Sequence, residues 1–485
     1  MPFLVAFAAG AAAVLGFSPF GFILATLAAL AVLAHLWVRA ASPRAGFVRG
    51  FAFGLGFFLA GVSWVYVSMA RFGGMPAPLA AIATLGFCAF LALFPAAAGW
   101  AQARLAPPAL RPLAIPALWV LAEWLRGWAL TGFPWLGMGY AGIGSPLAGF
   151  APLGGVYLVS LALVASAVLL RQIAVGERRW AAAAVFAGLG IAGAALQRVE
   201  WTLPAARAVS VALLQGDVAQ SLKFDPARYE RTLQTYARLA EASRARLIVL
   251  PETAVPRFLD LVDPAYLARL RAVALRNGGD LLLGVPRRTG PETYYNSVVS
   301  LGVSPSGVYD KVHLVPLGEF VPPGFGWIIR ALRIPLSDFS RGPALQPPLA
   351  VAGERVAVDV CYEDAYGEEV IRPLPAATLL VNVSNVAWFG DSLAPAQHLQ
   401  IARMRALEAG RAMLTATNTG ITAAIGADGT VLARLPQFVQ GRLELEVRGR
   451  SGATPYVAFA DGPVLALAVL LASFCALRRP RAGSR

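Results

Sequence analysis

Cysteine is scarce in this chain of 485 residues, and one of its three cysteines stands among polar residues. Cys361 follows the β-branched run at 355–360 and precedes Tyr362, Glu363 and Asp364. A nucleophile at a turn from strand to helix is exposed at the edge of a sheet, where backbone N–H groups can face a developing oxyanion. Cys361 is therefore a candidate nucleophile, and a buried structural cysteine is the alternative interpretation.

The choice of basic residue draws attention to Lys311. The chain holds 41 lysines and arginines, and only residues 223 and 311 are lysine. A compact ammonium can stabilise an oxyanion or exchange a proton, whereas a guanidinium effectively never gives up its proton. We interpret Lys311 as a functional residue. The alternative is that both lysines are ordinary surface residues, and this is the interpretation that we favour for Lys223.

Two carboxylates stand where they could serve these groups. Glu252 follows the apolar run at 247–250, at the carboxyl end of a predicted strand, where α/β sheets place ligands. Given proximity to Lys311, it could take a proton from a thiol. Glu319, eight residues after Lys311, could orient the lysine or the base. The alternatives for Glu252 are a position beside a helix N-cap or a solvated position, and the alternative for Glu319 is a surface position.

The composition indicates a membrane protein. Apolar residues make up 57% of the chain and charged residues 14%, with a mean hydropathy of +0.62, which is too apolar for an ordinary soluble enzyme. The net charge of +14 does not indicate nucleic-acid binding, because the arginines lie beside apolar runs rather than in one basic block. Cys88 and Cys475 lie inside apolar stretches and the three histidines are far apart, so we expect no disulfide, no metal site and no cofactor.

Eight apolar stretches are candidates for crossing a bilayer, which takes roughly 20 helical residues. They lie near 3–16, 19–38, 48–70, 77–103, 112–132, 148–170, 180–197 and 463–477. Arginines follow the second, fourth, sixth and eighth stretches, whereas the opposite loops hold only Arg71. Because basic residues accumulate in cytoplasmic loops, the pattern predicts a bundle of about eight transmembrane helices with residues 200–460 outside the cytoplasm. Glu123 and Arg126, in the fifth stretch, either bind a lipid headgroup or pair with each other, and we favour pairing.

The polar region from 200 to 460 has the texture of one α/β domain. Runs at 209–214, 247–250, 281–285, 356–360 and 378–383 predict buried strands, and 226–244, 263–277 and 395–412 predict helices with charged outer faces. The tail at 420–447, with a turn at 426–429, predicts a closing hairpin. We therefore expect a helical bundle over 1–198, a layered sheet domain over 199–460, and a C-terminal transmembrane helix with a basic cytoplasmic tail over 461–485.

Longer motifs resemble those of the nitrilase superfamily and, within it, the apolipoprotein N-acyltransferase family. In the polar region they are LPET at 250–253, YDKVHLVPLGEFVP at 309–322, CYE at 361–363, NVSN at 382–385, AWFGD at 387–391, QH at 397–398, ARMRALE at 402–408 and TN at 417–418. In the membrane half they are GVSWVY at 61–66, EWLRG at 123–127 and GFPWL at 132–136. The resemblance covers essentially the whole chain.

The resemblance implies a carbon–nitrogen hydrolase domain folded as an αββα sandwich, with a Glu–Lys–Cys triad. It assigns Glu252 as general base, Cys361 as nucleophile and Lys311 as the cation that stabilises the oxyanion. Further residues match positions of the family: Glu319, Tyr362, Glu363 and Trp388. Phe224 stands where the family has Trp, which keeps an aromatic side chain. Val386 stands where Asp is usual, so a hydrogen-bonding carboxylate is lost.

The resemblance also implies the reaction. An acyl chain passes from a phospholipid to the cysteine as a thioester, and then to the α-amine of the N-terminal diacylglyceryl-cysteine of an apolipoprotein. The expected setting is the bacterial cytoplasmic (inner) membrane, with a monomer whose catalytic domain faces the periplasm. The loop 320–329 reads as a lipid-facing segment or as an ordinary packed loop. A membrane-tethered nitrilase-type amidase and a non-catalytic membrane binding or transport protein are the alternatives.

Overall fold

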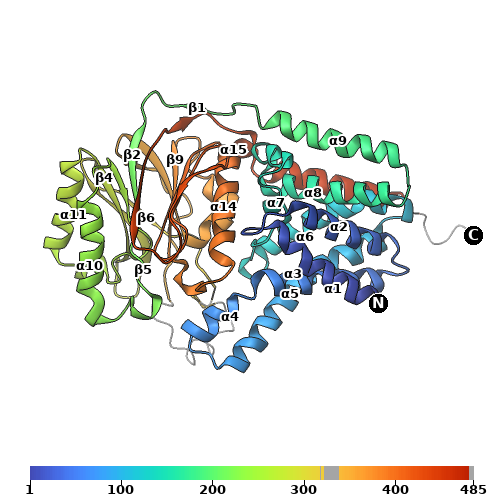
Figure 1. Cartoon of the computed structure of the whole chain (residues 1–485), viewed down its shortest axis with the longest axis horizontal. Helices are drawn as coiled ribbons and strands as arrows, with labels where there is room; N and C mark the ends of the chain where they lie inside the picture. Colours follow the sequence, from blue (N-terminus) through green and yellow to red (C-terminus); the bar gives the residue numbers. More distant parts are fainter. Residues whose placement is uncertain (317, 322–337, 480–485) are drawn as a thin grey trace, which may run out of the picture. The chain divides into compact units, whose positions relative to one another are not determined.

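The computed structural model describes residues 1–316, 318–321 and 338–479. The chain forms two compact units (Figure 1). One unit contains Met1–Tyr66, Pro76–Val199 and the C-terminal segment from Ala458. The other contains Glu200–Val457 together with Val67–Met75. The short segment 67–75 is the difference from the expected division, which gave all of residues 1–198 to the helical bundle.

The first unit is helical, and each of the eight apolar stretches contains a helix. The helices are α1 Pro2–Ala13, α2 Ile23–Val38, α3 Pro43–Val62, α5 Ala77–Leu105, α6 Arg111–Trp128, α8 Ala151–Ala174, α9 Arg179–Leu196 and α16 Gly462–Leu477. Five helical segments are long and apolar enough to cross a membrane, at Pro43–Val62, Ala77–Leu105, Pro108–Thr131, Pro146–Ala174 and Arg179–Leu196. The other three stretches form shorter apolar helices, at Pro2–Gly16, Ile23–Val38 and Gly462–Leu477.

Small residues allow α3 and α5 to approach closely. A Cβ atom added at Gly46 would lie 2.2 Å from the carbonyl oxygen of Gly99, and one added at Gly50 would lie 2.4 Å from the carbonyl oxygen of Pro95. Glycines four residues apart lie on one face of a helix, and such faces are typical of helix pairs in membranes. The sequence of α3 therefore fixes which side of this helix meets its neighbour.

Two ionisable residues of α6 hold the loop that follows this helix. The carboxylate of Glu123 accepts hydrogen bonds from the indole of Trp119 and from the backbone N–H of Met138, both at 2.8 Å. Arg126 donates to the carbonyl oxygens of Phe133 and Trp135, both at 2.6 Å. Both side chains thus anchor the loop to the end of α6.

The second unit is built on two six-stranded sheets. In the first, the order is β13-β2-β3-β4-β5-β6, with β13 Gly441–Val447, β2 Val209–Gln215, β3 Leu247–Val249, β4 Asp280–Arg288, β5 Tyr294–Gly302 and β6 Val308–Asp310. In the second, the order is β12-β11-β10-β9-β8-β7, with β12 Val431–Arg434, β11 Ala423–Ile425, β10 Met413–Thr417, β9 Leu379–Ser384, β8 Glu354–Val360 and β7 Leu349–Val351. A short pair, β1 Leu203–Pro204 and β14 Arg450–Ser451, lies apart from both.

These sheets face each other, and helices cover their outer faces, which confirms the expected αββα sandwich (Figure 1). Apolar side chains of both sheets form the central core. The helices α10 Pro226–Glu241 and α11 Pro264–Arg276 cover the first sheet, and α14 Ala394–Ala409 covers the second. Both α10 and α11 begin with Asp-Pro, where the aspartate caps a backbone N–H two residues on, at 2.9 Å for Asp225 and 2.8 Å for Asp263.

Parallel strands set the place of the site. Strands β2, β3 and β4 run parallel in one sheet, and β8, β9 and β10 run parallel in the other. Glu252 follows β3, Cys361 follows β8 and Asn385 follows β9, so all three stand at carboxyl ends of strands. The five runs predicted to be strands are strands in the structure, and the three predicted helices correspond to α10, α11 and α14.

The closing hairpin was predicted only in part. Strands β11 and β12 pair in antiparallel fashion around the predicted turn. Strand β13, however, leaves this hairpin and pairs with β2 in the other sheet. Alternation along a strand shows which residues share a face, but not which sheet supplies the partner.

Candidate active site

Cys361 sits at a strained turn between β8 and a short 3₁₀ helix, Cys361–Ala365. Its φ of 55° lies in the left-handed region, which costs a non-glycine residue roughly 1–2 kcal/mol. Its carbonyl oxygen accepts hydrogen bonds from the side-chain amide of Asn382 at 3.0 Å and from Nε2 of His398 at 3.2 Å. These two contacts hold the strained backbone, as expected for a nucleophile presented at the end of a strand.

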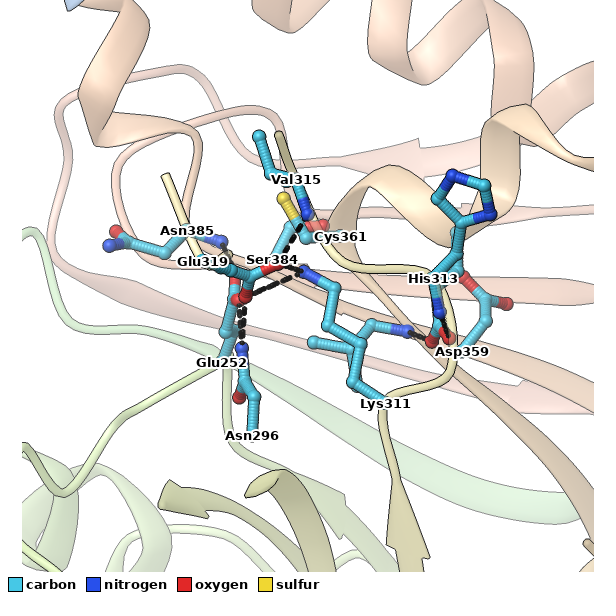
Figure 2. A network of polar contacts seen from close by, with 12 residues as sticks. Glu252, Asn296, Lys311, His313, Val315, Glu319, Asp359, Cys361, Ser384 and Asn385 are labelled. Carbon is cyan, nitrogen blue, oxygen red and sulfur yellow. Dashed lines mark hydrogen bonds and ion pairs between the residues drawn. The ribbon is translucent and has the colours of Figure 1, made fainter. Parts of the chain in front are cut away.

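Lys311, Glu252 and Glu319 converge at one buried point (Figure 2). The Lys311 ammonium lies 2.8 Å from one carboxylate oxygen of Glu319 and 3.7 Å from Oε1 of Glu252. The side-chain amide of Asn296 donates to both glutamates, at 2.6 Å to Glu252 and 2.8 Å to Glu319. Lys311 is 1% exposed, Glu252 7% and Glu319 9%, so the surface interpretation of the lysine and of Glu319 is wrong.

The buried surroundings of Cys361 favour its protonated thiol. Burial and the charge of Glu252 raise the pKa of Cys361 well above its usual value, although Lys311 and the backbone N–H of Asn385 act in the opposite direction. Burial disfavours the ammonium of Lys311, but Glu319 and Glu252 outweigh it and raise its pKa above the usual value. A protonated thiol beside a permanent cation needs a base. Both glutamates act on both groups, and Glu252, which lies farther from the ammonium of Lys311 than Glu319 does, is the candidate base.

The carboxylate of Glu252 is held in place from two sides. Its Oε1 accepts from Asn296, and its Oε2 accepts from the backbone N–H of Asn385 at 2.7 Å. Asn385 is itself fixed, because its side-chain NH₂ group donates to Gln220 at 2.8 Å and its side-chain oxygen accepts from Asn418 at 3.0 Å. The carboxylate therefore has a defined orientation before any substrate binds.

Glu363 joins the strand of the cysteine to the loop of the lysine. Its carboxylate accepts from the backbone N–H groups of Val312 at 2.6 Å, His313 at 3.0 Å and Val360 at 2.7 Å, and from the hydroxyl of Tyr309 at 3.0 Å. Burial raises the pKa of Glu363 to about 7, although the charge of a nearby lysine and these N–H groups lower it. Glu363 thus acts on the site through the backbone beside it.

Tyr362 lies in an aromatic cluster beside the same loop. Its ring contacts that of His313, with centroids 5.8 Å apart, and its hydroxyl accepts from that of Tyr366 at 3.1 Å. The ring of Tyr366 stacks on His313 at 3.6 Å. This packing supports the loop that follows Lys311 from its far side.

Trp388 lies in the 3₁₀ turn Val386–Phe389, directly after Asn385. Its carbonyl oxygen accepts from the hydroxyl of Ser68 at 2.8 Å, and its ring meets Phe72 edge-to-face at 6.1 Å. The contacting residues belong to a π-helical turn, Ser68–Phe72. The sequence interpretation assigned residues 68–70 to the third membrane stretch and residues 71–72 to the loop that follows it. That stretch was predicted too long, because α3 ends at Val62 while apolar residues continue.

Lys223 was interpreted wrongly. It is 3% exposed, not at the surface, and its ammonium donates to the carbonyl oxygen of Glu252 at 3.0 Å. The rarity of lysine, which singled out Lys311, applied equally to Lys223 and could have found it. Phe224, next to it, is half-buried. Val386, which replaces the expected aspartate, is buried at 2% exposure.

In the part of the chain that the structure describes, no group of three or more His, Cys, Asp or Glu side chains could hold a metal ion. The chemistry available here is thus that of a thiol, two glutamates and buried ammonium groups. This set supports nucleophilic attack on a carbonyl carbon, with a base for the thiol proton and a cation for the oxyanion.

Comparisons with known proteins cover both units. Residues 9–169 match the model of the apolipoprotein N-acyltransferase N-terminal domain, and residues 210–456 match that of carbon-nitrogen hydrolase. Apolipoprotein N-acyltransferases of Nitrosomonas europaea, Ralstonia nicotianae and Chromobacterium violaceum are 49%, 44% and 45% identical to this chain. The matches cover 96%, 99% and 95% of this chain and 95%, 95% and 91% of those proteins.

Proposed function

The chain belongs to the apolipoprotein N-acyltransferase family, and we propose that its acyl transfer runs through a thioester on Cys361. Glu252 is the general base and Lys311 is the cation that faces the oxyanion. The observation that carries this assignment is the buried cluster of Lys311 with Glu252 and Glu319, which stands beside a cysteine at a strained strand end.

The first step acylates the enzyme. Glu252 takes the proton of Cys361, and the sulfur attacks an ester carbonyl of a phospholipid. The charge that develops on the carbonyl oxygen is stabilised by the ammonium of Lys311. The ester C–O bond then breaks, the proton on Glu252 passes to the leaving oxygen, and a lysophospholipid departs. The acyl group remains on the sulfur.

The second step transfers this acyl group to the acceptor. The free α-amine of the N-terminal diacylglyceryl-cysteine of an apolipoprotein attacks the thioester carbonyl, and Glu252 takes the proton that the nitrogen loses. The C–S bond breaks as the amide forms, and the thiolate of Cys361 recovers the proton. The product is an N-acylated, triacylated lipoprotein, and the free enzyme is restored.

Glu319 and Glu363 are positioning residues in this proposal. Glu319 contacts the ammonium of Lys311 and also accepts the backbone N–H of Val315 at 2.8 Å. It thereby ties the lysine to its own loop and leaves Glu252 free to exchange a proton. Glu363 fixes the backbone on either side, next to Lys311 and next to Cys361.

The proposed setting is the bacterial cytoplasmic membrane, with the eight helices of the first unit crossing it. Arginines that follow every second apolar stretch support this topology and an extracytoplasmic catalytic domain over 199–460. The proposed assembly is a monomer. Of the loop 320–329, which we interpret as a lipid-facing segment, residues 322–329 lie outside the described residues.

Intact mass measurement with labelled phospholipid tests the mechanism. The expected result is an acyl adduct on Cys361 that hydroxylamine removes and that disappears when a diacylated lipopeptide is added. Cys361→Ser should show no thioester, and Cys88→Ser, a change of a buried cysteine in α5, should keep the adduct. An adduct that is lost equally fast without the lipopeptide would favour a membrane-tethered amidase that releases its product to water.

A further inference from the structure

Lys223 is a second buried cation at the site. It stands between the 3₁₀ turn Gln220–Leu222 and α10, and its ammonium donates to the carbonyl oxygen of Glu252 at 3.0 Å. Among the described residues it forms no salt bridge, although an ammonium carries three donors. The turn before Lys223 is tied to the site by a separate contact, because Gln220 accepts a hydrogen bond from the side-chain amide of Asn385 at 2.8 Å.

A charge in such a place is costly unless nearby negative charge offsets it. Burial lowers the pKa of Lys223 to about 8, against the opposing influence of Glu252 and Cys361. Glu252 and Cys361 are also the two groups between which a proton moves in the first step. The ammonium therefore lies against the backbone of Glu252, close enough for its charge to act on both groups, and no carboxylate in the described chain forms a salt bridge with it.

We propose that Lys223 is a positioning residue of the acylation step, which holds the backbone of Glu252 and stabilises negative charge on Cys361. This inference rests on the proposed function, because it concerns the same sulfur. It also explains why both lysines of the chain are buried at one place, whereas the other basic residues are arginines.

A count of formal charges supports the role. Lys311, Glu252 and Glu319 together carry one net negative charge, and a thiolate that forms by proton transfer to Glu252 leaves that sum unchanged. With Lys223 protonated, the sum is zero before and after the transfer. A buried cluster of zero net charge accommodates the thiolate at lower cost than one with an uncompensated anion.

Other charged groups around the sulfur do not replace it. Lys311 is already bound by two carboxylates. His398 contacts the carbonyl oxygen of Cys361, but Asp364 lies 3.1 Å from the same ring nitrogen and compensates its charge. Among the described residues, Lys223 is thus the cation that remains for the extra negative charge.

The test is the rate at which iodoacetamide alkylates Cys361, followed by peptide mapping between pH 6 and 10, with thermal unfolding measured in parallel. Lys223→Gln keeps a donor but removes the charge, so the apparent pKa of Cys361 should rise by about one unit and the rate at pH 7.5 should fall about tenfold. Arg228→Gln removes one charge from an exposed position five residues away and should leave the rate unchanged.

A second substitution decides the matter if Lys223→Gln does not fold. Arginine does not titrate in this range. In Lys223→Arg the positive charge should therefore still promote alkylation of Cys361 above pH 8, where the wild-type lysine loses its proton and this effect. If the folded variants show the same pH profile of Cys361 alkylation as the wild type, the proposed role of Lys223 is wrong. Failure of the proposed function would give a different result. The wild type would then form no acyl adduct with phospholipid, whatever the rate at which iodoacetamide alkylates Cys361.

Discussion

Glu363 offers the sharpest test of how the site is held together. Its carboxylate accepts hydrogen bonds from the backbone N–H groups of Val312, His313 and Val360 and from the hydroxyl of Tyr309. Glu363→Ala would leave all four donors without that acceptor in a buried place. Each such donor costs ~1–3 kcal/mol. At the lower limit the loss is ~4 kcal/mol, a large share of the 5–15 kcal/mol that stabilises a typical domain.

Glu363→Gln should behave differently, because two effects oppose each other. The amide keeps one oxygen as acceptor but turns an NH₂ group toward donors, which costs ~2 kcal/mol. The charge is removed at the same time. The pKa of Glu363 is about 7 rather than 4.5, and at 1.36 kcal/mol for each unit of pKa the buried charge costs ~3 kcal/mol above pH 7. We therefore expect Glu363→Gln to be nearly as stable as the wild type at pH 8.

The pH dependence of the stability tests the raised pKa of Glu363. Because the pKa of Glu363 is raised in the folded state, its contribution to stability is complete below about pH 4.5 and is lost as the pH rises to about 7. The stability of the wild type relative to Glu363→Gln should fall over this window and stay constant above it. Unfolding of both proteins in detergent between pH 4.5 and 8.5 measures this difference in stability. A difference that stays constant or rises with pH would contradict the raised pKa of Glu363. The acylation rate of Cys361 should fall in both variants, since the backbone beside Lys311 loses its anchor.

Four further substitutions test other contacts. Burial disfavours the charged ring of His398, but Asp364 outweighs it and raises the pKa of His398, so its stabilisation is complete below pH 6.5 and is lost as the pH rises further. The unfolding temperatures of wild type and His398→Asn should therefore converge between pH 6 and 9, and divergence would contradict the ion pair. Phe224→Trp keeps an aromatic ring at a half-buried position and should change the acylation rate by less than about threefold; a tenfold loss would show that ring size matters. Trp388→Ala and Phe72→Ala should each lower stability by ~0.5–1.5 kcal/mol beyond lost burial, and a double-mutant cycle without coupling would show that the ring contact contributes nothing.

The residues of the proposed catalytic cluster could be singled out because each stands out in the sequence. Cys361 and Glu252 directly follow predicted strands, and the carboxyl ends of parallel strands meet at one edge of an α/β sheet. Lys311 stands out because lysine is rare. Their meeting point depends on the pairing of strands far apart in the chain, which neither periodicity nor composition specifies.

Two errors have a physical cause. Lys223 lies in a polar segment, and polar sequence does not distinguish an exposed lysine from one buried beside a carbonyl oxygen. Residues 63–70 continue the apolar character of α3, so hydropathy could not show that the helix ends at Val62. The hydroxyl of Ser68 binds the backbone of Trp388, a contact between residues 320 positions apart that no local signal reveals.

The distribution of buried cations suggests why two lysines persist in a chain that otherwise uses arginine. Arg411 is fully buried and donates to the carbonyl oxygens of Ala377 at 2.9 Å and Gly452 at 2.7 Å, and Arg405 contacts Glu408 at 3.0 Å. The planar guanidinium suits such fixed partners, because its donors keep one geometry. In the proposed reaction the negative charge at the cysteine moves between oxygen and sulfur, and a compact ammonium on a flexible stem can follow it. By this reasoning Lys311→Arg should fold, since Glu319 can still pair with it, yet lose most of its acylation rate; full activity would show that only the sign of the charge matters.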